Sequence, residues 1–216
     1  ELGDKVETLY VENVAEDASA IPVIRDLAQQ GCKLIFTTSY GYMDQTLQVA
    51  SEFPDVKFEH CAGFKRADNV ATYNSKFHEG RAVLGTISGK MSKSGTLGYL
   101  GSYKVPEVVL GVNAFALSAQ RMNPAATVKL VLIDSWFDPP KEAAATETLV
   151  NLGCDIVTTH TDSPGPLQIL EQKGLFGFGQ GADMSAFAPQ AHLTAIEDIW
   201  GPYYVARTKM ILDGSW

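Results

Sequence analysis

Residues 128–140, with the sequence VKLVLIDSWFDPP, carry the clearest structural signal in this chain. An apolar run suited to a buried strand passes into a short polar and aromatic loop, and an alanine-rich amphipathic segment follows. An open parallel sheet places its ligand crevice at such a position, outside the carboxyl end of a strand. We therefore predict that the ring of Trp136 faces a ligand. The alternative is that Trp136 and Phe137 only close the top of the sheet as packing residues.

The same succession of strand and helix recurs along the chain. Runs of β-branched and aromatic residues predict strands, and apolar residues spaced three and four apart predict the helices between them. Strands are expected at residues 6–12, 33–36, 56–59, 69–73, 97–100, 128–133, 155–158, 175–178 and 193–196. Helices are expected at residues 21–28, 44–53, 75–91, 106–121, 141–152, 166–173 and 201–212. This alternation is typical of an α/β protein with mostly parallel sheets flanked by helices.

The strand and helix pattern restarts near residue 96, which predicts two α/β lobes. We assign residues 1–93 and 196–216 to the first lobe and residues 94–195 to the second. A cleft is expected between the strand ends of the lobes, because small-molecule sites concentrate at domain interfaces.

Glycines interrupt the long helix expected at residues 75–91. Gly80, Gly85 and Gly89 each lower the helix propensity by roughly 1 kcal/mol relative to alanine. We expect them to allow another backbone to approach the helix closely.

The composition excludes several classes of function. The 216 residues carry a formal net charge of -8, which argues against a nucleic-acid partner because affinity for phosphates depends on clustered Lys and Arg. No apolar run is long enough to predict a membrane-spanning helix. Cys32, Cys61 and Cys154 have no CxxC spacing, so the sequence supports neither a zinc site nor a redox motif. We expect no metal and no cofactor.

No catalytic constellation stands out. Ser39 and Ser135 lack the GxSxG setting of a hydrolase nucleophile, and the histidines have no regular metal-ligand spacing. His160, after a predicted strand, is open to two interpretations, a general base or a structural histidine held by hydrogen bonds, and we favour the second. The sequence therefore predicts a binding protein without catalytic residues.

An aromatic or polar cluster follows almost every predicted strand. Flat rings offer stacking faces, and neighbouring carboxylates or amides can read the edge of a planar ligand in a pocket that excludes water. The clusters therefore predict a planar heteroaromatic ligand. The candidate ligand-binding residues in these loops are Tyr40, Tyr73, Asn74, Phe77, Trp136, Phe137 and Asp162.

Several longer motifs together resemble a known family. They are FTTSYGYMD at 36–44, FPDVKF at 53–58, NVATY at 69–73, SWFDP at 135–139, HTDSP at 160–164 and WGPYY at 200–204. The combination is similar to the basic membrane protein family of ABC-transporter substrate-binding proteins, the PnrA-like purine receptors. The resemblance implies a two-lobed type I periplasmic-binding-protein fold and a monomeric, lipoprotein-like receptor in a periplasmic or other extracytoplasmic location. It also implies capture of a purine for import through the membrane permease of an ABC transporter.

Position by position, the resemblance implies roles for individual residues. Trp136 matches the aromatic residue that stacks on one face of the purine, and Tyr40 matches an aromatic residue at the cleft edge. The nucleoside receptors of the family have Gly-x-Asp-x-Asp, whose first Asp holds the ribose hydroxyls, where this chain has Gly-Gln-Gly-Ala-Asp ending at Asp183. Gly181 stands in place of that Asp, so we predict a free nucleobase, with adenine favoured, over a nucleoside. Gln180 and Asp183 complete the predicted ligand-binding set.

The chain departs from the family pattern at both ends. Family members begin with a further strand and helix, whose loop supplies an Asp and a second stacking aromatic residue, and we expect this chain to lack them and any signal segment. The C-terminus, at residues 214–216, also looks truncated relative to the family. The alternatives to a nucleobase receptor are a purine nucleoside receptor, a cytosolic nucleoside-processing α/β enzyme, and a ligand-sensing regulatory domain of the same two-lobed fold.

Overall fold

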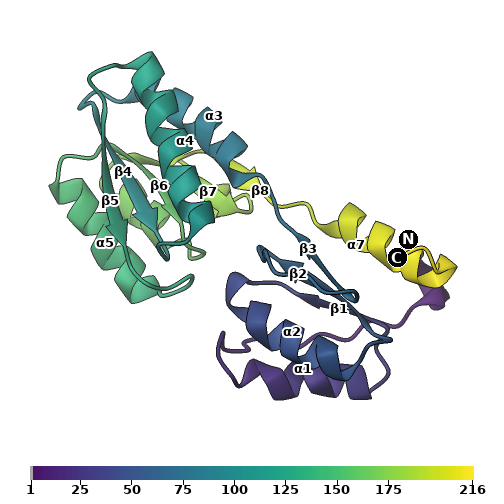
Figure 1. Ribbon diagram of the computed structural model, residues 1–216. Helices are drawn as coiled ribbons and strands as arrows, with labels where there is room; N and C mark the ends of the chain where they lie inside the picture. The colour runs from purple at the N-terminus through teal and green to yellow at the C-terminus, as the bar shows by residue number, and fades with distance from the viewer. Residues whose placement is uncertain (1) are drawn as a thin grey trace. The chain divides into compact units, whose positions relative to one another are not determined.

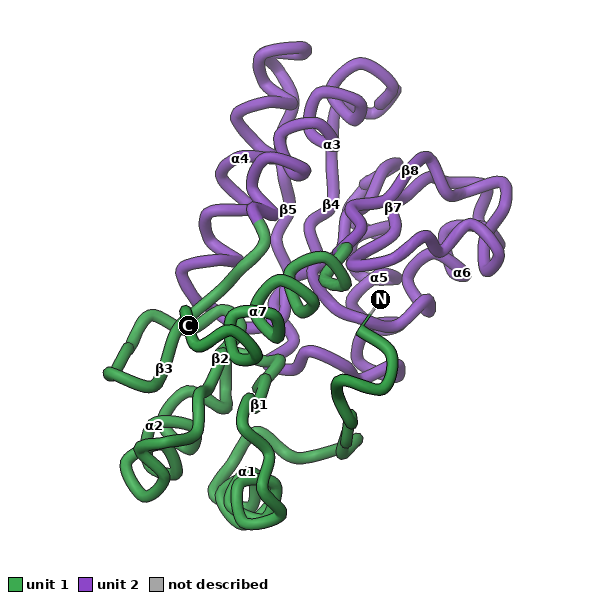
Figure 2. Tube along the Cα trace, turned by 90° about the vertical axis from the view of Figure 1, so that its right-hand side faces the viewer, with its two compact units in different colours: residues 1–75, 199–216 green, residues 76–198 purple. Residues whose placement is uncertain are grey.

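The computed structural model describes residues 2–216 and divides the chain into two compact units (Figures 1 and 2). The first unit runs to Ser75 and resumes at Ile199–Trp216, and the second unit is Lys76–Asp198. Each unit contains a parallel sheet with helices packed against it. The predicted α/β class with parallel sheets flanked by helices is confirmed.

Helix α3 (Phe77–Met91) belongs to the second unit, whereas the sequence placed it in a first lobe ending at residue 93. The difference arises because α3 packs along the length of helix α4 (Pro106–Met122). A Cβ atom at Gly85 would lie 2.2 Å from a carbonyl oxygen of α4, and one at Gly89 would lie 2.4 Å from another. The predicted close backbone approach is therefore confirmed at Gly85 and Gly89, whereas Gly80 faces the side chain of Ile196 and no backbone.

The sheet of the first unit has strands in the order β1, β2, β3, all parallel. These strands are β1 (Leu34–Thr37), β2 (Lys57–Cys61) and β3 (Val70–Tyr73). Its helices are α1 (Ala20–Gln29), α2 (Met43–Glu52) and α7 (Gly201–Asp213), and short 3-10 turns lie at Gly3–Lys5 and Tyr40–Tyr42. Helices α1 and α2 cover one face of the sheet, where Ile24, Val49 and Phe58 belong to a single buried apolar cluster.

Helix α7 and the chain after it are held to the sheet by a buried carboxylate. Glu59 on β2 is fully buried and accepts hydrogen bonds from the Tyr203 hydroxyl at 2.8 Å, Arg207 Nε at 2.5 Å and the Trp216 indole N–H at 2.6 Å. A buried carboxylate is tolerated when donors surround it in this way. Glu59 therefore fixes the C-terminal segment against the first unit.

The predicted strand at residues 6–12 is wrong, because this segment forms no ladder in the structure. A cavity of about 1330 Å³ lies along this segment and β1 and is lined by both. A strand needs a hydrogen-bonded neighbour about 4.8 Å away. With the cavity beside it, the segment has none, and Leu9, Tyr10 and Val11 remain exposed.

The second unit has a larger sheet, also entirely parallel, with strands in the order β5, β4, β6, β7, β8. Its strands are β4 (Thr96–Gly101), β5 (Thr127–Leu132), β6 (Ile156–His160), β7 (Phe176–Gly181) and β8 (His192–Glu197). Besides α3 and α4 it contains α5 (Pro139–Asn151), α6 (Gly165–Gln172) and a 3-10 turn at Ser185–Phe187.

Helices cover both faces of this larger sheet. One buried cluster joins α3 and α4 to the sheet through residues such as Leu84, Tyr99 and Phe115. A second cluster joins α5 and α6 to the opposite face through Leu149 and Leu167. Both faces are apolar because a sheet sandwiched by helices is removed from water on each side. Among residues 2–216, no helix is long and apolar enough to cross a membrane.

Candidate ligand-binding site

The candidate site is the carboxyl edge of the sheet in the second unit. All strands of this sheet are parallel, so the loops after β4, β5, β6 and β7 leave the same edge. These loops and strand ends carry Ser102, Trp136, Asp162 and Gln180. Four chain segments distant in sequence therefore bring polar and aromatic groups to one place.

The loop after β5 turns sharply at Asp134. This residue has a φ of 51°, a left-handed conformation that Asp tolerates better than most residues, and its N–H donates to the Ser102 carbonyl at 3.0 Å. The half-buried ring of Trp136 follows, with its centroid 5.3 Å from that of Tyr103 and 6.2 Å from that of His160. Phe137, also a predicted ligand residue, is 63% exposed. Trp136 thus lies beside two other rings, whereas Phe137 is largely exposed to solvent.

The loop after β6 is tied to the Trp136 loop. The N–H of Asp162 donates to the Trp136 carbonyl at 2.9 Å. Glu142 of α5 is fully buried and accepts at Oε1 from the backbone N–H of Asp138 at 3.0 Å. Its Oε2 accepts from the hydroxyls of Thr161 and Ser163, both at 2.8 Å. One carboxylate therefore fixes both loops, and the exposed Asp162 side chain is carried on a rigid support.

His160, at the end of β6, is a buried part of this edge. Its Nδ1 lies 3.3 Å from the Tyr99 hydroxyl and its Nε2 lies 3.6 Å from Glu107 Oε1. Since a carboxylate can only accept, we place the proton on Nε2 and let Nδ1 accept from Tyr99. Burial lowers the pKa of His160, although Glu107 acts in the opposite direction. Phe77, the first residue of α3, packs against the imidazole with ring centroids 5.1 Å apart. The favoured interpretation of His160 as structural fits this setting.

Gln180, at the end of β7, contacts a residue that sequence reasoning missed. The guanidinium of Arg81 in α3 donates to Gln180 Oε1, to the Thr158 hydroxyl at 2.8 Å and to the Thr159 carbonyl at 2.7 Å. Arg81 has no exposed surface, and burial lowers its pKa. The missed signal was spacing, because Arg81 lies four residues after Phe77 on the buried stripe of the helix. A charged residue on such a stripe is unusual without polar partners.

The other predicted residue on this segment, Asp183, is exposed at the start of a turn. Its carboxylate accepts from the Ser185 N–H at 2.9 Å, which lowers the pKa of Asp183, and lies 3.7 Å from His192 Nε2. The structure therefore gives Asp183 a turn-capping role and leaves part of its carboxylate in contact with solvent.

The predicted residues of the first unit lie at the carboxyl edge of its own sheet. Tyr73 is buried in an aromatic cluster, where its ring stacks on Tyr203 with centroids 4.8 Å apart and its hydroxyl lies 3.1 Å from that of Tyr204. Asn74 is exposed and accepts from the backbone N–H of the next residue at 2.8 Å. Tyr40 is half-buried in its 3-10 turn. Tyr73 is thus more buried and makes more packing contacts than Asn74 and Tyr40.

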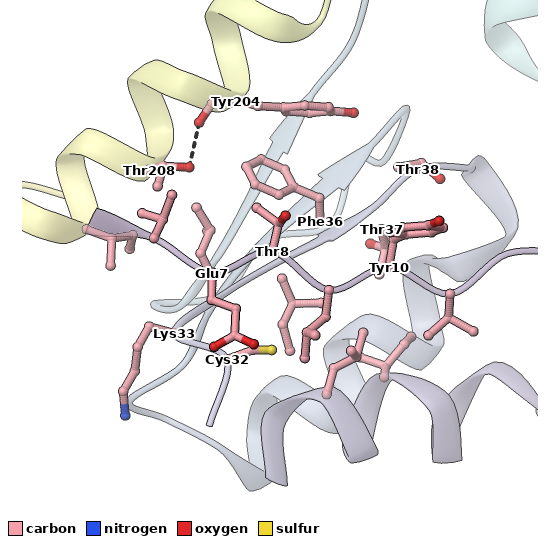
Figure 3. A pocket seen from close by; sticks show the side chains of 18 of the residues that line it. Glu7, Thr8, Tyr10, Cys32, Lys33, Phe36, Thr37, Thr38, Tyr204 and Thr208 are labelled. Atoms are coloured by element: carbon pink, nitrogen blue, oxygen red, sulfur yellow. Dashed lines mark hydrogen bonds between the residues drawn. The ribbon is translucent and has the colours of Figure 1, made fainter. Parts of the chain in front are cut away.

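The large cavity of the first unit is a separate feature (Figure 3). Its lining includes Phe36, Thr37 and Thr38 of the β1 region, and α1, α7 and the segment at residues 6–13 supply the other walls. None of the predicted ligand residues lines it. Its volume exceeds that of typical small-molecule pockets, which is about 300 to 1,000 Å³. It lies beside β1, which is the first strand in the order of its sheet.

Metal and thiol chemistry find no support at either edge. Within residues 2–216, no group of three or more His, Cys, Asp or Glu side chains could hold a metal ion. Within residues 2–216, none of the three cysteines forms a disulfide, and burial raises the pKa of the Cys154 thiol to about 11. A protonated thiol is a poor nucleophile.

A family model and two relatives of known sequence resemble this chain over almost its whole length. The family model described as "ABC transporter substrate-binding protein PnrA-like" matches residues 2–216. A protein of Brucella abortus named purine-binding protein is 56% identical over 215 residues, which cover 100% of this chain and 61% of the relative. A protein of Haloferax volcanii named putative ABC transporter glucose-binding protein is 34% identical over 213 residues, 99% of this chain and 54% of the relative. The chain thus spans little more than half the length of these relatives.

Solved structures resemble the chain in fold. A solute-binding protein of an ABC transporter system from Aeropyrum pernix K1 superposes with a TM-score of 0.80 at 18% identity, covering 92% of this chain and 60% of that one. The corresponding protein from Conexibacter woesei gives a TM-score of 0.71 at 23% identity, covering 93% of this chain and 69% of that one. At these identities the likeness extends to the fold alone.

Proposed function

Because the chain belongs to the PnrA-like family of ABC-transporter substrate-binding proteins, we propose that it captures a purine nucleobase, with adenine favoured, for import. The family consists of solute-binding proteins of ABC transporters, which are not enzymes. In this proposal the protein works outside the cytoplasm as a monomer and delivers the base to a membrane permease. The relative with 56% identity is named for purine binding, which favours a purine over the sugar in the name of the relative with 34% identity.

Trp136 is the proposed stacking platform. Its ring is half-buried, and its backbone is fixed through the hydrogen bond to Asp162 and through the neighbouring Glu142 anchor. A ring held in this way loses little conformational entropy when a base stacks on it, because its rotamer and backbone are already ordered. Asp162 and Gln180 supply polar groups at the same sheet edge to read the purine's hydrogen-bonding edge. Tyr40, Asn74, Phe77, Phe137 and Asp183 remain proposed contributors of lesser weight.

The observation that carries the choice of a nucleobase over a nucleoside is the glycine at position 181. Its φ is 72°, and a Cβ atom built there would meet nothing within 4 Å. Glycine supplies no carboxylate at this position, and no other heavy atom lies within 4 Å of the place where a Cβ atom would stand. A ribose needs acceptors for its hydroxyls, and hydrogen bonds to charged groups contribute about 1.5 to 3 kcal/mol each. Without such a group, the sugar gains less from binding than the base does.

Mass spectrometry of the small molecules released when freshly purified protein is denatured tests this proposal. We expect a purine base, with adenine the first candidate, in near-stoichiometric amount. Release of a purine nucleoside would support the nucleoside alternative and contradict the specificity argued from Gly181. Release of a hexose would contradict the proposal as a whole.

A further inference from the structure

Arg81 imposes a fixed orientation on the side-chain amide of Gln180. The guanidinium has no acceptor atom, so only the carbonyl oxygen of the amide can face it. The hydrogen bond from Arg81 to Gln180 Oε1 meets this requirement. A reversed amide would point its NH₂ group at a buried donor and leave both groups without a partner. Arg81 therefore determines that Oε1 of Gln180 faces the guanidinium and that the NH₂ group faces away from it.

Arg81 is itself held firmly and has no access to a ligand. It is fully buried and donates to the Thr158 hydroxyl and the Thr159 carbonyl of β6. The guanidinium carbon lies 5.4 Å from the centroid of the Tyr99 ring, and the absence of a side chain at Gly111 of α4 leaves room for the Tyr99 hydroxyl. Since no part of Arg81 is exposed, it acts through Gln180, as a positioning residue.

The orientation determines what Gln180 can offer at the sheet edge. With Oε1 occupied by Arg81, the remaining end of the side chain is the NH₂ group, which only donates. Gln180 lies at the carboxyl end of β7 and retains 6% exposure. A ligand group facing it must therefore be an acceptor, such as an unprotonated ring nitrogen or a carbonyl oxygen. An amino group or a protonated ring nitrogen would meet a donor and be disfavoured.

We infer that Gln180 selects the ligand by donating to an acceptor atom on its ring edge, and that Arg81 fixes this selectivity by holding the amide in one orientation. The inference rests on the proposed function, in which a purine base binds at this sheet edge. Beyond that function, Gln180 is the donor and the ligand the acceptor in one recognition contact, and the buried Arg81, which does not touch the ligand, controls this contact.

A double-mutant cycle between protein and ligand tests the inference. Adenine, 1-deazaadenine, 3-deazaadenine and 7-deazaadenine, each deaza compound lacking one ring-nitrogen acceptor, are titrated by calorimetry into the wild-type chain and into Gln180→Leu. We expect one deaza compound to bind the wild type roughly tenfold more weakly than adenine. In Gln180→Leu that difference should fall below about threefold, because the donor is gone. Gln168→Leu, an exposed glutamine of the same unit, serves as the matched control and should keep the wild-type pattern.

The role of Arg81 is tested with Arg81→Met. If the variant folds by circular dichroism, its amide at position 180 is free to turn, and the same deaza discrimination should shrink toward the value in Gln180→Leu while adenine still binds. If Arg81→Met does not fold, the Gln180 cycle decides by itself. The inference is overturned if every deaza difference keeps its size in Gln180→Leu, or if folded Arg81→Met retains full discrimination. A wild-type chain that binds no purine would instead refute the proposed function.

Discussion

The backbone N–H of Asp162 donates a 2.9 Å hydrogen bond to the carbonyl oxygen of Trp136, which joins the loop after β6 to the loop after β5. The two loops carry the proposed stacking ring and a proposed polar contact. Because Glu142 accepts from both loops as well, they form one ordered unit at the sheet edge. A base that stacks on Trp136 would then meet a site that is already in place.

Glu142→Ala should weaken both stability and purine binding. The substitution removes the acceptor of Asp138, Thr161 and Ser163 and leaves buried donors without partners. We expect a loss of about 3 kcal/mol in the free energy of unfolding, measured by urea denaturation. Glu147→Ala, at an exposed position of the same helix, is the matched control. An equal effect of the two substitutions would contradict the anchoring role of Glu142.

Trp136→Ala should reduce affinity for the base far more than it reduces stability. Stacking of a base on an aromatic side chain contributes about 1 to 3 kcal/mol, so the dissociation constant should rise roughly fivefold to 150-fold. Trp136→Phe retains a flat ring and should recover most of the affinity. Phe187→Ala, at an exposed aromatic residue of the same unit, should leave the dissociation constant unchanged. Unchanged affinity in Trp136→Ala would mean that the indole only packs the sheet edge.

Glu59→Gln should loosen helix α7 from the first unit. The amide keeps one acceptor but loses the charge that faces Arg207, whose side chain is 20% exposed. We expect a destabilisation of about 2 kcal/mol, below the range for fully buried ion pairs because water partly screens the arginine. Glu52→Gln removes the exposed ion pair with Arg25 and should change stability little. Hydrogen exchange in α7 faster in Glu59→Gln than in wild type would locate the effect, whereas unchanged exchange would count against it.

Thermal stability should fall as the pH decreases below about 6.5, the ordinary pKa of histidine. Burial lowers the pKa values of His60 and His160, so the unfolded chain binds more protons than the folded chain between the folded and unfolded pKa values. The stabilisation is therefore complete above the unfolded pKa and is lost as the pH falls through this window. Melting temperatures from pH 7.5 to 5 for the wild type and His160→Gln check this. A wild-type melting temperature that is flat over this range would refute the prediction.

The sequence predicted most of the fold because its periodic signals are local. The helices at 75–91 and 106–121 and the strand at 128–133 appear within a few residues of their predicted bounds, since each has a continuous apolar pattern. Residues 6–12 have an equally clear β pattern and form no strand. Strand formation requires a partner in the ladder, and a local pattern contains no information on whether one is present.

The site was predictable only in part, for a related reason. Aromatic residues after strands, such as Trp136, are recognisable from sequence because their position relative to a strand end is local. Arg81 and Glu142 support the site from within helices. Arg81 donates to Gln180, which lies 99 positions away in the chain, and Glu142 accepts from Ser163, which lies 21 positions away. Such contacts depend on the tertiary arrangement. The position of Arg81 on the buried stripe of α3 indicates that it needs polar partners, whereas no local sequence pattern indicates the role of Glu142.

Parallel calorimetric titrations of ligand-free protein with adenine and with adenosine show whether the protein holds a purine base without its sugar. We expect adenine to bind at one site per chain with a measurable exothermic or endothermic isotherm. Adenosine should bind at least roughly tenfold more weakly, because no carboxylate at position 181 receives the ribose hydroxyls. Tight binding of adenosine together with no binding of adenine would contradict this expectation.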